Sequence, residues 1–316
     1  MAELVVMNGA GNIARSVVSA HLAKNAGKYA SVKMIDARPH RQSVYNWQRG
    51  LGGVTLNKHM ARSAQSIDLG LEGAKEVLYF THDYYSMSSD KNSHLLAAAK
   101  LTKKHGVKNF VAVCPMEQDL AWSEDPKTWH EKMVEEEANA VSVNSSMTLL
   151  KTNLAFGGES HLIHFLAQCA LVGKCPYKNL LNKEAQHQWA PVHTSDIASA
   201  VDSALGGSAH GRYSLAGNTH MNLRQIMDAI ETAADKTPGS TGGPILPPFD
   251  YLWDFFYGTG ADLNMSRLVD FYEKNPVASA PKWSETSVDH QFTMDKIVEE
   301  DYAHPTMASY KLTHTD

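Results

Sequence analysis

The chain has 316 residues, and its 29 Lys and Arg against 34 Asp and Glu give a formal net charge of −5. Apolar residues make up 43% and charged residues 20%, which is ordinary for a globular protein and excludes a disordered chain, a collagen or a coiled coil. A pI near 6.3 argues against a general nucleic-acid binder, because affinity for phosphates needs a basic surface. The absence of an apolar run of about 18 residues predicts that no transmembrane helix is present.

Cysteine usage and the start of the sequence bear on the compartment. Cys114, Cys169 and Cys175 form neither a disulfide framework nor a C-x-x-C metal site, which indicates a reducing compartment such as the cytosol or the mitochondrial matrix. The sequence opens directly on an apolar strand pattern without a signal peptide or an Arg-rich leader. Either no leader is needed, or a leader was removed before this numbering begins, or the targeting signal lies within the chain.

Short apolar runs alternate with segments of helical spacing through the first part of the chain. The predicted strands are residues 3–7, 31–35, 76–80, 109–113 and 148–154. The predicted helices are residues 13–24, 93–105 and 129–141, with a helical turn near 71–75. This alternation is typical of βαβ units, so we expect an α/β fold: a Rossmann-like, doubly wound parallel sheet.

The alternating pattern of strands and helices weakens after about residue 235. Residues 236–244 (KTPGSTGGP) are rich in turn formers, and a segment of prolines and aromatics follows at 245–257. We therefore predict an NAD(P)-binding domain over residues 1–235. A smaller, mostly helical or irregular C-terminal lobe is expected over 236–316, with residues 158–190 contributing to it.

A glycine-rich turn follows the first predicted strand. Residues 9–14 (GAGNIA) fit the pattern G-x-G-x-x-A and open the first predicted helix. Glycines let the backbone approach a pyrophosphate, and a helix N-terminus offers free N–H groups and a positive dipole end to that anion. The predicted cofactor-binding residues here are Gly9, Ala10, Gly11, Asn12 and Ile13.

The end of the second predicted strand bears on the choice of cofactor. Asp36 is placed to accept hydrogen bonds from an adenosine ribose, which favours NAD. Arg38 and Arg41 follow closely, and either could instead clamp the 2′-phosphate of NADP. The residues alone leave this choice open. Thr81 and His82, directly after the strand at 76–80, are further predicted neighbours of the nucleotide.

Other polar clusters are expected to be structural. His59, His161, His164, His187 and His193 lack the spacing of metal ligands, and we predict no metal site. They are interpreted as histidines that lie at the surface or in the core with their hydrogen bonds satisfied. Residues 135–137 (EEE) are interpreted as an exposed helical face.

The order of these elements resembles the extended or atypical branch of the short-chain dehydrogenase/reductase family over about residues 3–235. The segments that carry the resemblance are 93–114, 148–157, 191–198 (PVHTSDIA) and 211–217 (GRYSLAG). The family pairs a catalytic tyrosine with a lysine four residues later. Lys132 fits the lysine, which would hold the nicotinamide ribose, but Thr128 stands at the tyrosine position. Cys114 stands where the family has a serine or threonine, and His130 is a weak substitute acid.

Within that family the chain looks most like the nucleotide-binding accessory subunits of mitochondrial complex I. Three segments suggest this: 149–157 with Glu159 and 161–165, then 190–196, and the proline-aromatic stretch 246–253. The resemblance implies tightly held NADP(H), no catalytic residue, and other complex I subunits as partners, on the matrix side of the mitochondrial inner membrane. The glycine turn differs, being one residue shorter than the family's G-x-x-G-x-x-G.

The aromatic segment 246–257 is the predicted docking element, because clustered aromatic rings suit protein interfaces and membrane surfaces. Packing against the Rossmann core is the other interpretation. For the whole chain we expect a non-catalytic, NAD(P)H-binding accessory subunit of complex I with a structural or assembly role. The alternatives are an active, soluble NAD(P)-dependent reductase or epimerase and an NmrA-like nucleotide sensor.

Overall fold

A computed structural model describes residues 2–37, 39–40, 42–61, 63–80, 95–115, 126–153, 155–157, 166–167, 169–170, 173, 190–207, 210–217, 219 and 221–242. Most of the predicted C-terminal lobe and the aromatic segment 246–257 therefore lie outside the described residues. The predicted boundary at residue 235 stays a prediction.

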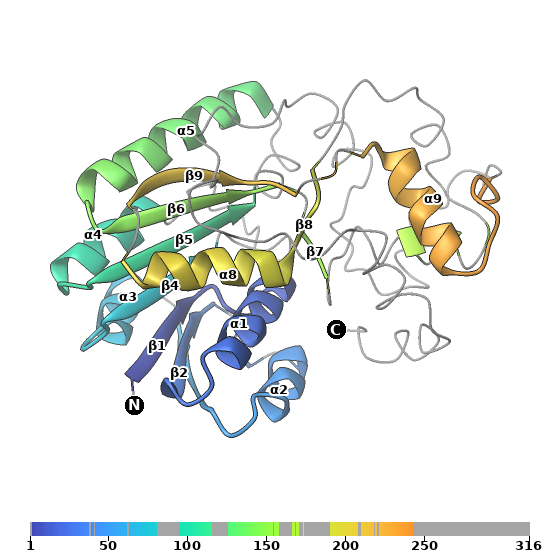
Figure 1. Cartoon of the computed structure of the whole chain (residues 1–316). Helices are drawn as coiled ribbons and strands as arrows, with labels where there is room; N and C mark the ends of the chain where they lie inside the picture. Colours follow the sequence, from blue (N-terminus) through green and yellow to red (C-terminus); the bar gives the residue numbers. More distant parts are fainter. Residues whose placement is uncertain are drawn as a thin grey trace.

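Seven parallel strands form the central sheet, in the order β3-β2-β1-β4-β5-β6-β9 (Figure 1). They are β1 (Ala2–Met7), β2 (Tyr29–Asp36), β3 (Thr55–Met60), β4 (Glu76–Phe80), β5 (Asn109–Pro115), β6 (Met147–Thr152) and β9 (Gly211–Leu215). The strand order reverses between β1 and β4, and in such sheets ligands bind at the carboxyl ends of the strands beside this point. The predicted Rossmann-like α/β fold is confirmed.

Helices cover both faces of the sheet (Figure 1). The described helices are α1 (Asn12–Lys24), α2 (Gln42–Arg49), α3 (Ala64–Gly70), α4 (Leu95–Lys104), α5 (Pro126–Val143), α8 (Thr194–Leu205) and α9 (Leu223–Ala233). One apolar cluster joins α1, α2 and α8 to one face, and a second joins α4, α5 and the end of α3 to the other. Each strand of the centre is buried on both sides, which explains its almost continuous apolar sequence.

Sequence patterns located most of these elements and missed others. The predicted helical turn near 71–75 is wrong: α3 ends at Gly70, and Leu71 is its C-cap. The helix α2 and the strand β3 were not predicted. The sequence of β3, TLNKHM, is mostly polar because this strand lies at the edge of the sheet. The helix α9 carries a capping box, in which Asn222 and Gln225 bond each other's backbone N–H groups.

A two-stranded parallel sheet lies beyond the carboxyl end of the main one. It pairs β7 (Ala155–Phe156) with β8 (Val192–His193), which leads directly into α8. Gly157 follows β7 with φ of +106°, and a Cβ there would lie 2.3 Å from Nε2 of His193. The resembling segments 148–157 and 191–198 are thus brought together at this small sheet.

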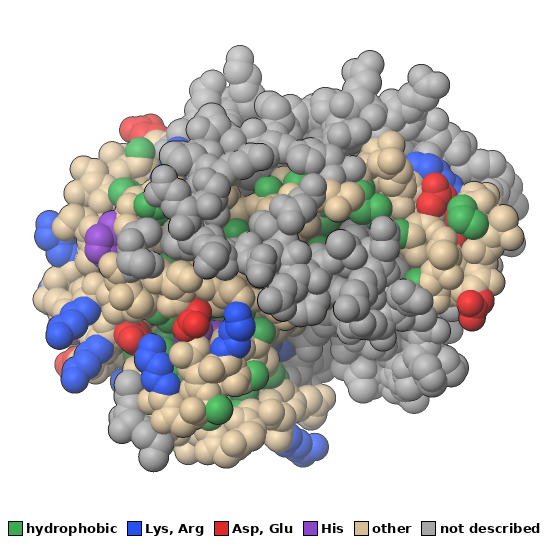
Figure 2. All heavy atoms as spheres, in the orientation of Figure 1, with side chains coloured by type: hydrophobic (Ala, Val, Ile, Leu, Met, Phe, Trp, Pro, Cys, Tyr) green, Lys and Arg blue, Asp and Glu red, His purple; other side chains and the backbone are tan. Residues whose placement is uncertain are grey.

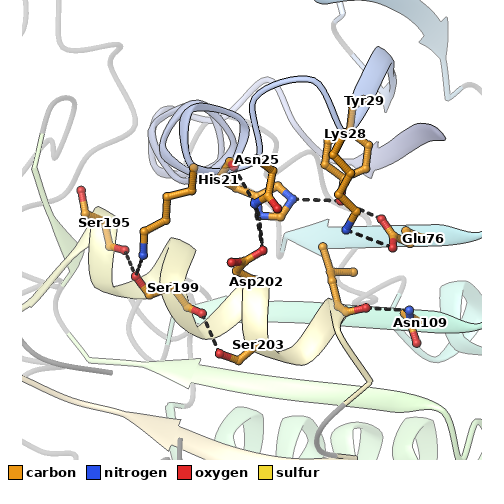
Figure 3. Close-up of polar contacts among 12 residues, drawn as sticks. His21, Asn25, Lys28, Tyr29, Glu76, Asn109, Ser195, Ser199, Asp202 and Ser203 are labelled. Carbon is orange, nitrogen blue, oxygen red and sulfur yellow. Dashed lines mark hydrogen bonds and ion pairs between the residues drawn. The ribbon is translucent and has the colours of Figure 1, made fainter. Parts of the chain in front are cut away.

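A polar cluster fills the interface of α1 and α8 at the opposite, amino-terminal edge of the sheet (Figure 3). Nδ2 of Asn25 donates to Oδ1 of Asp202 over 2.8 Å, which ties the two helices. Nε2 of the fully buried His21 lies 3.1 Å from the hydroxyl of Tyr29, which donates to Glu76 over 2.6 Å. Burial lowers the pKa of His21 below its ordinary value, although nearby Asp202 opposes this shift. The cluster lies at the opposite ends of the strands from the glycine turn.

Candidate functional site

The turn after β1 is built on a strained residue, Asn8. Its φ is +56°, a left-handed conformation in which Asn is one of the few tolerated residues besides glycine. The Asn8 N–H donates to the carbonyl of Ile35 at the end of β2, and its side-chain amide donates to the carbonyl of Phe80 at the end of β4, each over 2.8 Å. Asn8 therefore joins the carboxyl ends of three neighbouring strands.

This conformation corrects the interpretation of the turn as one residue short. Asn8, Gly11 and Ala14 have the spacing of the three glycines in G-x-x-G-x-x-G, and Asn8 takes a backbone conformation suited to glycine. The sequence pattern missed this because it counted only glycines, whereas the backbone requires a positive φ rather than a particular residue.

The next residues form the N-terminus of α1. A Cβ at Gly9 would lie 2.7 Å from Cγ1 of Val6, so the close packing of turn and strand requires glycine there. Gly11 is the N-cap and supplies no side-chain cap, and the first turn of α1 contains no acidic residue. The first backbone N–H groups of a helix have no acceptor within it, so this end suits an anion such as a pyrophosphate.

Asp36 comes to the turn from the end of β2. Its side chain is 9% exposed, and Oδ2 accepts a hydrogen bond of 3.0 Å from the N–H of Ala10. The predicted ribose-binding acid and the predicted phosphate-binding turn are therefore in direct contact. N–H donors for a pyrophosphate and a carboxylate acceptor for a ribose hydroxyl meet at one place, which is the combination that suits a dinucleotide.

The other predicted cofactor residues are placed only in part. Arg38, Arg41, Thr81 and His82 lie outside the described residues. The backbones of Asn12, Thr128, His130 and Lys132 belong to α1 and α5, and their side chains also lie outside what the structure describes. The side chain of Ile13 packs against the apolar cluster under α1, so only its backbone N–H is left for a ligand.

Cys114 is at the carboxyl end of β5, as the resemblance implied for the family's serine or threonine. Its thiol is fully buried in the apolar cluster that α4 and α5 cover. Its register partner in β6 is Lys151. This placement favours a packing role for Cys114, and contact with a cofactor stays a prediction.

The acidic face predicted at residues 135–137 is wrong for Glu137. That side chain is 1% exposed and lies between α5 and the sheet, 2.8 Å from Nζ of Lys151 and 2.8 Å from Nη2 of Arg212. Glu135 is exposed, as expected. The three consecutive acids were interpreted together as exposed, and the two cations that make burial of Glu137 possible come from distant strands, β6 and β9.

His193 is partly buried and its ring is hydrogen-bonded, which agrees with its interpretation as a structural histidine. Its Nδ1 accepts the backbone N–H of Ser195 and so caps α8, while its ring meets Phe156 edge-on at 5.3 Å. Burial lowers the pKa of His193 to about 4, so the ring is neutral at physiological pH. Histidine is an uncommon N-cap, and sequence patterns therefore did not predict this role.

The described surface carries both signs of charge. Figure 2 shows Lys and Arg interspersed with Asp and Glu over the part of this face that α1 and α8 form. Among the described helices none is long and apolar enough to cross a membrane. In the same part of the chain, no three His, Cys, Asp or Glu side chains are grouped to hold a metal ion.

No protein-family model and no curated protein sequence matches this chain. Its fold, in contrast, is similar to many solved structures. A dTDP-glucose 4,6-dehydratase from Bacillus anthracis, solved in complex with NAD, matches with a TM-score of 0.66 and 15% identity, over 99% of this chain and 98% of that one.

Two further enzymes are similar at the same level. A UDP-glucose 4-epimerase from Bifidobacterium longum, in complex with NAD⁺ and UDP, has a TM-score of 0.62 and 13% identity over 94% of this chain and 96% of its own. The triphenylmethane reductase of Citrobacter sp. has a TM-score of 0.62 and 15% identity over 96% of this chain and 100% of its own. At these identities the likeness concerns the fold alone, which in this chain is a Rossmann-like α/β fold.

Proposed function

We propose that this chain binds NAD(H) at the glycine turn between β1 and α1. The observation that carries the proposal is the hydrogen bond from Ala10 to Asp36, which puts a ribose acceptor beside the pyrophosphate donors. Dehydratase and epimerase structures of the same fold, solved with NAD, support the same cofactor class. NAD is favoured over NADP because the carboxylate of Asp36 would repel a 2′-phosphate at that position.

Titration of the purified chain with NAD⁺ and with NADP⁺ in a calorimeter tests the cofactor proposal. We expect NAD⁺ to bind at least about tenfold more tightly, an affinity difference of about 1.4 kcal/mol. Asp36→Asn removes the negative charge and should narrow or reverse this preference. Asp228→Asn, on the distant helix α9, is the matched control and should leave it unchanged. A chain that binds neither dinucleotide would contradict the proposal.

For the role of the bound nucleotide we propose first a reductase or epimerase of the short-chain dehydrogenase type. The similarity in fold to a dehydratase, an epimerase and a reductase over nearly the full length of the chain supports this role. NAD(H) would supply hydride transfer, and the chain would bind and orient it. Lys132, on α5, is the residue proposed to hold the nicotinamide ribose. NAD(H)-dependent turnover of a panel of carbonyl compounds and sugar nucleotides should then occur and fall in Lys132→Ala.

The second candidate is a nucleotide-holding subunit without turnover, as in the accessory subunits of mitochondrial complex I on the matrix side of the inner membrane. The observation that favours it is the fully buried thiol of Cys114 at the strand end where the enzymes of the family carry a hydroxyl. In that role, other complex I subunits and the membrane surface would be the proposed contacts of residues 246–257. A bound nucleotide would stabilise the folded subunit by binding only the native state.

Fractionation by native size separates the two roles. In a gentle detergent extract, co-migration of the chain with a megadalton assembly that has NADH dehydrogenase activity would support the accessory subunit. Migration as a monomer or dimer would overturn that role. The absence of turnover with every substrate of the panel would overturn the proposed enzymatic role.

A further inference from the structure

Arg15, at the end of the first turn of α1, is a residue for which sequence patterns predicted no role. Its side chain is 4% exposed, and Nη1 donates a hydrogen bond to the carbonyl oxygen of Ala10. A buried guanidinium is costly unless its donors are used, so its place beneath the glycine turn calls for an explanation.

Ala10 is held at both of its backbone polar groups. Its N–H donates to Asp36 from β2, and its carbonyl accepts from Arg15 on α1. Two side chains from different elements thus fix the two peptide planes that meet at Ala10. Glycines on both sides give the backbone freedom, and this pair of bonds removes that freedom where the turn must be rigid.

The geometry of the peptide unit links this restraint to ligand binding. In a trans peptide the C=O and the following N–H point in opposite directions. Because the Ala10 carbonyl points at the buried Arg15, the Gly11 N–H of the same peptide points away from it. Gly11 is the N-cap of α1, so its N–H joins the first amides of the helix that are available to an anion.

We propose that Arg15 is a positioning residue, which presets the Gly11 amide for the pyrophosphate of the dinucleotide without touching it. The proposal rests on the proposed function, because it concerns the same site. The buried cation also lies on the positive end of the α1 dipole and adds to the attraction for a phosphate. Affinity for the phosphate part of a ligand should therefore depend on Arg15, and affinity for the nucleoside part should not.

The test compares ligands with and without phosphate on Arg15→Met, which keeps an unbranched apolar stem and removes the donors. Kd values for NAD⁺ and ADP come from calorimetry, and those for adenosine come from NMR titration. We expect Arg15→Met to weaken NAD⁺ and ADP by about tenfold and adenosine by less than about twofold. Arg15→Lys, which keeps a charged donor, should restore most of the affinity.

Arg224→Met is the matched control, because Arg224 pairs with Asp228 and Glu231 on the distant helix α9. It is expected to lower the melting temperature and leave all three Kd values unchanged. If Arg15→Met does not fold, Arg15→Gln, which keeps a shorter uncharged donor, takes its place with the same expected selectivity for phosphate ligands.

A folded Arg15 variant that binds NAD⁺ and ADP like the wild type would overturn the positioning role. Equal weakening of ADP and adenosine would also overturn it, since that pattern indicates a general structural effect. Failure of the wild type to bind NAD⁺ or ADP would instead overturn the proposed function itself.

Discussion

Nζ of Lys151 lies 2.8 Å from Oε1 of Glu137, and both side chains are almost completely buried between β6 and α5. Nη2 of Arg212 approaches the other oxygen of the same carboxylate. This ion cluster fixes α5, the helix that carries Lys132, against the carboxyl-terminal half of β6. The cluster thereby links α5 to both β6 and β9.

Removal of the Glu137 carboxylate should be strongly destabilising. Glu137→Ala leaves the buried Lys151 without its carboxylate, and we expect the free energy of unfolding to fall by about 3–5 kcal/mol. Urea denaturation followed by circular dichroism measures this change. Glu135→Ala, two residues away on the exposed side, is the control and should stay within about 0.5 kcal/mol of the wild type. Equal stability of the Glu137 and Glu135 variants would show that the cluster contributes little.

The left-handed conformation of Asn8 predicts an unusual order of variants. Asn8→Ala should lower the free energy of unfolding by about 2 kcal/mol, because Ala is strained at positive φ and loses the bond to Phe80. Asn8→Gly loses the same bond without the strain, so it should be more stable than Asn8→Ala by about 1 kcal/mol. Chemical denaturation of the three proteins gives the ranking. An Ala variant more stable than the Gly variant would contradict the assigned conformation.

Glycine-to-alanine changes should differ sharply with position. Gly157→Ala would place a Cβ against the His193 ring at a positive φ, and we expect a loss of about 3 kcal/mol or more. Gly242→Ala has nothing within 4 Å of its new Cβ, so its stability should stay within about 0.5 kcal/mol of the wild type. Thermal melts of the two variants distinguish them. A similar melting temperature for both variants would contradict the prediction, because it would mean that β7 and β8 move apart at little energetic cost.

Stability should decrease as the pH falls through the range set by His193. The pKa of His193 is about 4 in the folded chain and 6.5 in the unfolded chain. Below about pH 6.5 the unfolded chain therefore binds a proton at this residue while the folded chain does not, and this favours unfolding. Between pH 7 and pH 5 this one group should cost up to about 2 kcal/mol of stability. Urea denaturation at a series of pH values measures the slope.

His193→Asn is the informative variant for that slope, because Asn also caps a helix and has no proton to gain in this range. It should flatten the curve between pH 7 and pH 5 without removing the slope entirely, since the pKa of buried His21 is lowered as well. Superimposable curves for this variant and the wild type would show that His193 does not cause the effect.

Local sequence patterns were sufficient to predict the central strands of the sheet, and also the glycine turn and Asp36 of the candidate cofactor site. Apolar runs bounded by turn residues located β1, β2, β4, β5 and β6, because strands buried on both faces must be apolar almost throughout. The glycine turn and Asp36 were predicted together, since a parallel βαβ unit necessarily brings the ends of its first two strands to the same edge. These features depend on residues that are close in sequence or on a single topological rule.

Only the tertiary structure decided the remainder. It put Asn8 in the place of a glycine, buried Glu137 between two cations from distant strands, and turned Arg15 toward the Ala10 carbonyl. A sequence pattern shows which residues are polar, but the energetic cost of burying a polar group depends on partners that arrive from elsewhere in the chain. For that reason the sequence by itself determined the five strands β1, β2, β4, β5 and β6 and the position of the glycine turn, while the folded packing decided which polar side chains support them.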